Sequence, residues 1–257
     1  MLPIVTPEEM RAVDAAATEP AEVLIERAGG AVARAAVRML GGTYGRTVNV
    51  IVGKGNNGAD GRVAAKVLSR RGVRVRVFDA ANCPSVLPQA DLVIDAAYGT
   101  GFRGTWSPPD VGDARVLAVD IPSGVDGATG AAGAGVLPAD RTVTFAALKP
   151  GLVFPPGSQL AGELELVDIG LDVGARRVHL LQRDDVSDRW PHRGGNAHKW
   201  DAAVRIIAGS KTMPGAAALA AAGALRAGAG MVQVSSPGLE TSSALPVAVV
   251  QRPLPPH

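Results

Sequence analysis

The sequence predicts an α/β fold of three layers, in which helices cover both faces of a mainly parallel sheet. Segments with strand and helix patterns alternate along most of the chain. Several strand candidates, such as Val48 to Val52 and Leu92 to Ile94, are nearly continuous apolar runs typical of strands buried on both faces. Polar residues follow where these runs end, as at the ligand sites of open parallel sheets. This domain is expected to end near residue 175.

Two helices are expected first. Thr6 with Glu9 three residues later forms a capping-box pattern, and a second helix is expected over Ala21 to Leu40. Apolar periodicity from Val63 to Leu68 indicates a further helix. Strands are expected at Thr47 to Val52, Val73 to Phe78, Asp91 to Ala96, Arg115 to Asp120, Arg141 to Phe145 and Glu163 to Val167.

The rest of the chain predicts a linker and a second, smaller part. We expect one domain over residues 1–178, a linker over 179–199 that is rich in Arg, Asp and Pro, and a second part over 200–257. A strand at Ala202 to Ala208, a helix at Ala216 to Ala227 and a strand at Met231 to Val234 form a β-α-β pattern. About 60 residues are marginal for an independent fold, so this second domain is expected to be incomplete.

Composition excludes several classes of function. The 26 basic and 24 acidic residues give a net charge of +2, too small an excess to bind nucleic acid or an anionic membrane by bulk electrostatics. Cys83 is the single cysteine, so no internal disulfide is expected. The N-terminus has no signal-peptide pattern, and the alanine-rich stretch from Gly215 to Leu225 is too short to span a bilayer. A cytoplasmic location with no membrane role is therefore expected.

A glycine-rich loop follows the first strand at Gly53 to Gly61 (GKGNNGADG). Its first six residues match the dinucleotide pattern G-x-G-x-x-G, and Asp79 follows at about the expected distance for a ribose contact. Asp60, however, places a carboxylate at the helix start, which suits a cation or a sugar hydroxyl better than a pyrophosphate. An NAD-dependent dehydrogenase is thus one interpretation, with this objection.

Further polar residues are expected at the same edge of the sheet, because the carboxyl ends of parallel strands meet there. Asn57, Asp95 and Ser123 offer hard oxygen ligands for Mg²⁺, Ca²⁺ or a monovalent cation, and a single carboxylate favours low ionic charge. Asp120 and Lys149 are the candidates for proton transfer. The four histidines have no metal-ligand spacing and receive no role.

Together these motifs resemble the NAD(P)H-hydrate epimerases, the YjeF N-terminal domain family. The resemblance covers residues 1 to about 175 and rests on the loop at 53–61, the segments 95–102 and 120–126, and residues 142–145 with Lys149. Ala59 stands where the family usually has glycine, and its methyl group is compatible unless the backbone needs positive φ. The resemblance implies a Rossmann-like fold and an epimerase that interconverts the R and S forms of hydrated NADH and NADPH.

The resemblance also implies a set of functional residues. Asp120 and Lys149 would be catalytic, and one K⁺ per domain would bind at Asn57, Asp95 and Ser123. The implied substrate-binding residues are Asn56, Asn57, Gly58, Ala59, Asp60, Gly99, Thr100, Gly101, Phe102, Arg103, Gly104, Thr105 and Asp120. A homo-oligomer, dimeric or larger, is expected.

Residues from His198 onward resemble the beginning of the ADP-dependent NAD(P)H-hydrate dehydratase domain, which is ribokinase-like and in many bacteria is fused behind the epimerase. The segments that carry the likeness are 198–201, 206–210, 215–218 and 225–230. The later Gly-Thr-Gly-Asp segment of that family is absent from this sequence, so no dehydratase activity is expected, and ADP or ATP would bind only to a complete domain. A non-catalytic nucleotide-binding or scaffold module of the same fold remains a further alternative.

Overall fold

The computed structural model describes residues 1–102, 104–133, 135–190, 194–210, 212–238, 241–252 and 254. Contacts divide the chain into two compact units, Met1–Asp188 and Arg189–His257. The division falls inside the predicted linker. That segment also contains strand β8 (His179–Leu180) and helix α6 (Arg183–Arg189), which the sequence pattern did not predict.

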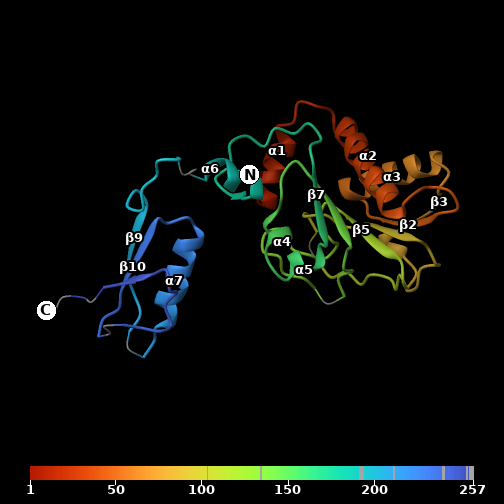
Figure 1. The fold of residues 1–257 in the computed structure, drawn as a ribbon. Helices are drawn as coiled ribbons and strands as arrows, with labels where there is room; N and C mark the ends of the chain where they lie inside the picture. Colours follow the sequence, from red (N-terminus) through yellow and green to blue (C-terminus); the bar gives the residue numbers. More distant parts are fainter. Residues whose placement is uncertain are drawn as a thin grey trace. The chain divides into compact units, whose positions relative to one another are not determined.

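A six-stranded sheet forms the centre of the first unit (Figure 1), with the strand order β3-β2-β4-β5-β6-β7. Every neighbouring pair is parallel. The strands are β2 (Thr47–Val52), β3 (Arg74–Asp79), β4 (Leu92–Ala96), β5 (Arg115–Val119), β6 (Arg141–Phe145) and β7 (Glu163–Val167). The predicted α/β fold with a mainly parallel sheet is therefore confirmed, and each strand lies within one residue of its predicted bounds.

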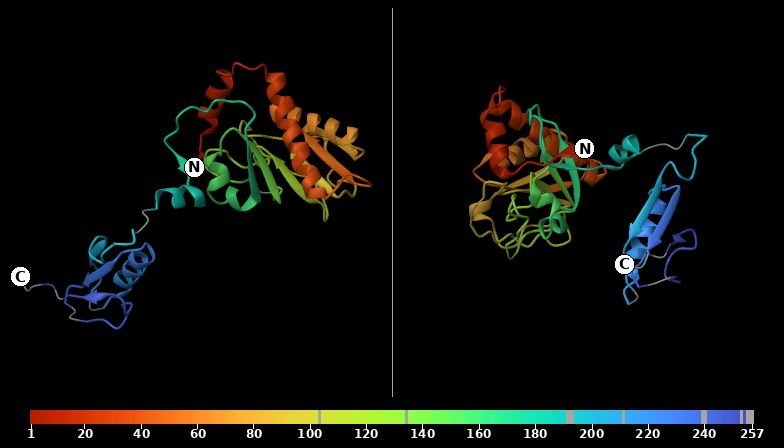
Figure 2. Two further views of the ribbon diagram at one scale, coloured as in Figure 1. Left: turned by 45° about the horizontal axis from the view of Figure 1, so that its top comes forward. Right: turned by 90° about the vertical axis from the view of Figure 1, so that its left-hand side faces the viewer.

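One face of this sheet packs against two long helices. Helices α2 (Ala21–Leu40) and α3 (Asn56–Arg70) lie side by side (Figure 2) and share a core with Val48, Val50 and Val52 of β2. Because side chains alternate along a strand, Ile51 points to the opposite face. Both faces of β2 are thus buried, as its nearly continuous apolar run predicts.

The other face is covered mainly by loops and short helices. Ile51 and Val93 pack there with Trp106, which belongs to the connection between β4 and β5. The described part of that connection has no helix, since it holds four glycines and two consecutive prolines that disfavour one. The short elements are η1 (Ala80–Asn82), α4 (Pro150–Val153) and α5 (Gly157–Leu160).

Helix α1 (Pro7–Ala15) is fixed at its start by the predicted capping box. The Glu9 N–H donates to Thr6 Oγ1 at 3.1 Å, and the Thr6 N–H donates to Glu9 Oε2 at 2.7 Å. Met10 and Val13 bury one side of the helix against Val5 and Ala147, close to the end of β6. Strand β1 (Leu2–Pro3) pairs antiparallel with β8.

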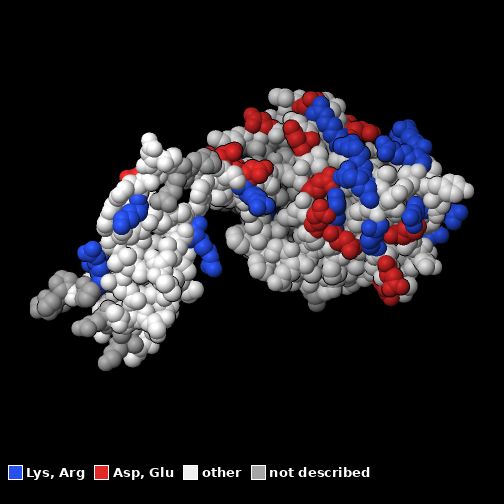
Figure 3. Space-filling model, in the orientation of Figure 1, with Lys and Arg blue, Asp and Glu red and all other residues white. Residues whose placement is uncertain are grey.

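Charged side chains of both signs lie on the surface of the first unit. On the face shown in Figure 3, Lys and Arg gather near β3, and Asp and Glu lie among them. Arg141 joins two strands, because its Nη2 lies 2.6 Å from Glu163 Oε2 and its Nη1 lies 3.1 Å from Glu165 Oε2. The charges of Arg141 and the two glutamates therefore partly neutralise each other.

The second unit has a parallel sheet of order β11-β10-β9, made of β9 (Ala203–Ile207), β10 (Met231–Ser235) and β11 (Val250–Gln251). Helix α7 (Gly215–Arg226) buries Ala217 and Ala221 against β10. The predicted β-α-β unit is confirmed, and β11 is an addition that the sequence pattern did not indicate. None of the helices described in either unit is long and apolar enough to cross a membrane.

Candidate active site

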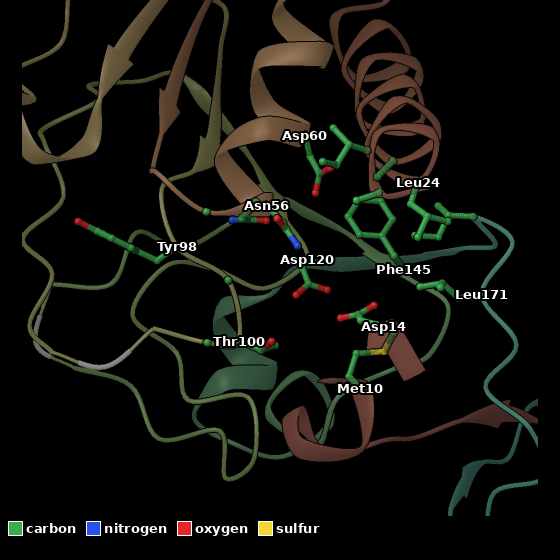
Figure 4. A pocket seen from close by; sticks show the side chains of 18 of the residues that line it. Met10, Asp14, Leu24, Asn56, Asp60, Tyr98, Thr100, Asp120, Phe145 and Leu171 are labelled. Atoms are coloured by element: carbon green, nitrogen blue, oxygen red, sulfur yellow. The ribbon is translucent and has the colours of Figure 1, made fainter. Parts of the chain in front are cut away.

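A cavity of about 680 Å³ opens at the carboxyl ends of β2, β4, β5 and β6 (Figure 4). Its walls come from distant parts of the chain: α1 and α2, the loops after β2 and β4, and the segments that follow β5, β6 and β7. One wall is apolar, with Leu24, Phe145 and Leu171, and the opposite side carries the polar residues Asn56 and Thr100. Carboxyl groups lie between the two. The cavity can therefore hold a ligand that is partly charged and partly apolar.

Lys149 lines this cavity and is only 1 % exposed. Its Nζ donates to Asp120 Oδ1 at 2.5 Å, to Thr144 Oγ1 at 2.9 Å and to the Phe145 carbonyl oxygen at 3.2 Å. A buried ammonium group requires such acceptors, because otherwise the loss of its hydration would destabilise the fold. Asp120 and Lys149, which the sequence singled out separately, thus form one ion pair.

Asp120 follows β5 with a backbone φ of +65°, which is uncommon for a residue other than glycine but is tolerated by aspartate. Its N–H donates to the Val143 carbonyl at 2.7 Å, so the turn is tied to β6. A Cβ atom added at Gly99 would lie 3.6 Å from Asp120 Oδ2 and 3.5 Å from Asn57 Cγ. Gly99 therefore leaves open space beside both side chains.

The glycine-rich loop is packed too tightly for side chains at three of its positions, Gly53, Gly58 and Gly61. A Cβ atom at Gly53 would lie 1.9 Å from the Ala97 carbonyl oxygen, and one at Gly58 would lie 2.0 Å from the Gly53 carbonyl oxygen. Gly55 caps α3, so the free N–H groups of its first turn border the cavity. Ala59 lies within α3 and is not among the residues with positive φ, so its methyl group is compatible with the backbone there.

Asp60 points into the cavity from the first turns of α3 (Figure 4) and is 7 % exposed. Its carboxyl group has no hydrogen-bond partner among the described residues. Burial raises the pKa of Asp60 to about 8, and the negative charge of Asp120 adds to the rise. This carboxyl group is therefore largely protonated at neutral pH and can donate a hydrogen bond to a ligand.

Asp14 reaches the cavity from α1, one helical turn after Met10, and the sequence did not single it out. Partial loss of hydration raises the pKa of Asp14; the positive charge of Lys149 opposes that rise, and the negative charge of Asp120 adds to it. An available signal was its spacing: Met10 and Asp14 lie on one helix face, where a polar side chain among apolar ones can mark a site.

Two of the three predicted cation ligands contact each other. Asp95 is buried, and its Oδ1 accepts from Ser123 Oγ at 2.6 Å while its Oδ2 accepts from the Ser123 N–H at 2.9 Å. Burial raises the pKa of Asp95, an effect that hydrogen bonds from Ser123 oppose. Asn57 lines the cavity, and its side-chain oxygen and nitrogen are buried without partners. Within the described residues, no group of three or more His, Cys, Asp or Glu side chains forms a metal-binding cluster.

The predicted substrate-binding residues fall into three groups. The cavity is lined by Asn56, Asn57, Asp60, Gly99, Thr100, Gly101, Phe102 and Asp120, together with Lys149. Gly58, Ala59, Gly104 and Thr105 are not among its lining residues, and Arg103 lies outside the described residues. Lys54, Tyr98 and Phe145 line it as well but were not predicted. Asp79, the candidate ribose ligand of the dehydrogenase interpretation, is not a lining residue; it caps η1 by accepting from the Ala81 N–H at 2.9 Å.

Comparisons with known proteins match both parts of the chain. The family described as YjeF-related protein N-terminus matches residues 21–86 and 79–151. The family described as NAD(P)H-hydrate dehydratase matches residues 204–251.

Two curated relatives share the name bifunctional NAD(P)H-hydrate repair enzyme Nnr. The protein from Moorella thermoacetica is 34 % identical over 286 residues, covering 91 % of this chain and 54 % of its own length. The protein from Mycobacterium leprae is 35 % identical over 248 residues, covering 84 % of this chain and 52 % of its own length. This chain therefore spans about half the length of these relatives. The crystal structure of yeast ynu0 aligns with a TM-score of 0.49 and 20 % identity, covering 69 % of this chain and 97 % of the yeast chain.

Proposed function

Because this chain belongs to the family of YjeF-related protein N-termini, we propose that its residues 1–178 catalyse the interconversion of the R and S forms of hydrated NADH and NADPH. The observation that carries the proposal is the buried Asp120–Lys149 ion pair, which lies in a cavity bounded by a glycine-rich loop. The names of the two relatives, both NAD(P)H-hydrate repair enzymes, support the choice of substrate.

The proposed reaction is an isomerisation without redox chemistry. Hydration at carbon 6 of the dihydronicotinamide ring places a hydroxyl beside the ring nitrogen, and such a hemiaminal centre inverts when the hydroxyl leaves and water returns on the other face. Asp120 acts as general acid and base at this hydroxyl or its water, and Lys149 balances charge. The Oδ2 of Asp120 borders the space at Gly99 and has no hydrogen-bond partner among the described residues, whereas Oδ1 is held by Lys149, and this supports the role.

The sugar-phosphate portion binds along residues 56–60 and 99–105. The N-terminal N–H groups of α3 and the exposed Lys54 offer favourable partners for phosphate. The apolar wall of Leu24, Phe145 and Leu171 suits the edge of the nicotinamide ring that does not react.

A monovalent cation such as K⁺ binds through Asn57, Asp95 and Ser123 and orders the loops. The orphaned side-chain oxygen of Asn57 and the buried carboxylate of Asp95 fit such an ion. Only one of the three residues is an acid, whereas a divalent ion usually recruits more carboxylates. The expected homo-oligomer, the cytoplasmic location and the lack of dehydratase activity stay predictions.

The direct test measures how fast the full chain equilibrates the R and S forms of hydrated NADH, which chromatography separates. Acceleration over the uncatalysed rate supports the proposal, and an unchanged rate removes it. Parallel assays for hydride transfer from NADH to a panel of carbonyl compounds test the dehydrogenase alternative.

A further inference from the structure

The Thr144 hydroxyl is a shared partner of Asp120 and Lys149. Thr144 lies at the end of β6, and its side chain is fully buried. Its Oγ1 donates to Asp120 Oδ1 at 3.1 Å and accepts from Lys149 Nζ at 2.9 Å. Lys149 Nζ also donates to Asp120 Oδ1, so the three polar groups close a triangle.

This triangle determines where the single hydroxyl proton points. Lys149 is donor-only, so the Thr144 oxygen must accept from it and the Thr144 proton is left for Asp120. Two donors then converge on Oδ1, and Oδ2 has no hydrogen bond within the described residues. The two carboxylate oxygens of Asp120 are therefore not equivalent.

Without this hydroxyl the orientation of the carboxylate would be less restricted. The backbone of Asp120 is already held at φ +65° and by its N–H bond to Val143, which leaves the side chain its rotations about Cα–Cβ and Cβ–Cγ. The rotation about Cβ–Cγ exchanges the two oxygens that can face Lys149. That torsion is broad and roughly two-fold in aspartate. Lys149 alone can hold either oxygen, whereas Lys149 and Thr144 together form two contacts with one.

We propose that Thr144 is a positioning residue that, together with Lys149, holds Oδ1 of Asp120 and so presents Oδ2 to the substrate. The inference rests on the proposed function, since it takes Asp120 as the group that exchanges protons with the substrate.

Thr144→Val in the full chain tests this inference, because valine keeps the branched shape and removes the hydroxyl. We expect kcat for epimer interconversion to fall about 10- to 100-fold, as misplacement of a reacting group typically does. KM should stay within about twofold, since Thr144 does not line the cavity. Thr144→Ser, which restores the hydroxyl, should recover most of the rate.

Thr142→Val is the matched control. Thr142 is also fully buried on β6 and points to the same face of the strand two residues earlier, but its hydroxyl donates to the Ala161 carbonyl at 2.7 Å, away from Asp120. Its variant loses a buried hydrogen bond of the same kind and should keep the wild-type kcat. A wild-type kcat in Thr144→Val, or equal losses of kcat in both valine variants, overturns the positioning role.

Crystal structures separate failure of this inference from failure of the proposed function. If the unaltered chain does not interconvert the epimers, the proposed function fails, but the Asp120 carboxylate can still be compared between the unaltered chain and Thr144→Val. More than one orientation of this carboxylate in the variant supports the positioning role of Thr144, and the same single orientation in both structures overturns it. If Thr144→Val does not fold, a structure of the unaltered chain with hydrated NADH decides: contact through Oδ2 supports the inference, and contact through Oδ1 overturns it.

Discussion

The two units of the chain contain similar strand–loop–helix segments in very different surroundings. In the first unit β2 is buried along almost its whole length between β3 and β4, and α3 packs against it. In the second unit β9 is an edge strand with one neighbour, and four of its five residues are exposed. The local pattern of strand, glycine-containing turn and helix is similar in both.

The difference teaches that a polar site depends on the neighbouring strands more than on the local motif. Lys149 can be buried because β6 supplies two acceptors, Thr144 Oγ1 and the Phe145 carbonyl, and Asp120 directly after β5 supplies the third. Just after β9, Ala208 makes two hydrogen bonds, because its carbonyl accepts from Ser236 Oγ at 2.8 Å and its N–H donates to the Ser235 carbonyl at 3.2 Å. Neither bond involves a charged group. If this is correct, catalysis, cation binding and the pH dependence of stability should all depend on the first unit.

The largest expected effect is that of Asp120→Asn. Asparagine keeps the shape and the hydrogen bonding but removes proton transfer, so the rate of interconversion should fall about 10²- to 10⁴-fold. Chromatography of the epimers, nucleotide affinity and thermal stability should be measured together, with the exposed Asp113→Asn as the control. If Asp120→Asn retains the wild-type rate while Lys149→Met is inactive, the two roles are reversed; if both are active, the site lies elsewhere.

The pH dependence of stability should distinguish the two units. The pKa of Asp60 is raised to about 8, so its folded form holds a proton that the unfolded form releases near pH 4. The stabilisation is complete below that lower value and is lost as pH rises to about 8, by at most about 1.4 kcal/mol per pH unit. Asp60→Asn should remove this loss of stability with rising pH. Calorimetry of the first melting transition from pH 4 to 9 measures it. An unchanged loss in the variant would show that another group causes it.

Potassium should stabilise the first unit and leave the second unaffected. An ion at 10 to 100 times its Kd stabilises the folded state by about 1 to 3 kcal/mol. Replacing K⁺ with choline at constant ionic strength should therefore lower the first melting transition and the turnover. Asn57→Ala should abolish the difference between the two cations. Equal melting and turnover in both cations would remove the ion from the proposal.

Removal of the second unit should have the smallest effect. A chain that ends at Asp188 keeps β8 and its pairing with β1, whereas a chain that ends at Val178 loses both. We expect both to retain epimerase activity, with the shorter chain melting a few degrees lower, since about 1 kcal/mol corresponds to roughly 2–4 °C at this size. Loss of activity in the Asp188 chain would show that the second unit supports the first.

Local patterns predicted the elements well because their causes are local. The capping box at Thr6, the apolar run of β2 and the periodicity of α3 each depend on neighbours within a few residues. These features placed the helix starts and strands without knowledge of the tertiary fold. They also placed Asp120 and Lys149 at one edge of the sheet, where the structure joins them.

The parts of the candidate site that the sequence missed depend on long-range packing. Asp14 reaches the cavity because Met10 and Val13 dock α1 near the end of β6, and Leu171 forms a wall because the chain returns there after β7. Asp79 had the expected spacing for a ribose ligand, but its carboxylate is used to cap η1. Spacing along the chain cannot reveal whether such a carboxylate binds a ligand or caps a neighbouring helix.

The burial of Lys149 also affects chemical labelling. An ammonium group that is 1 % exposed and held by three acceptors is shielded from amine-acylating reagents, whereas Lys54 and Lys66 are exposed to them. Acylation of Lys149 would therefore report that the structure has opened at the carboxyl ends of β5 and β6. The residue proposed to balance charge in the reaction thus serves as an internal probe of whether the first unit is folded.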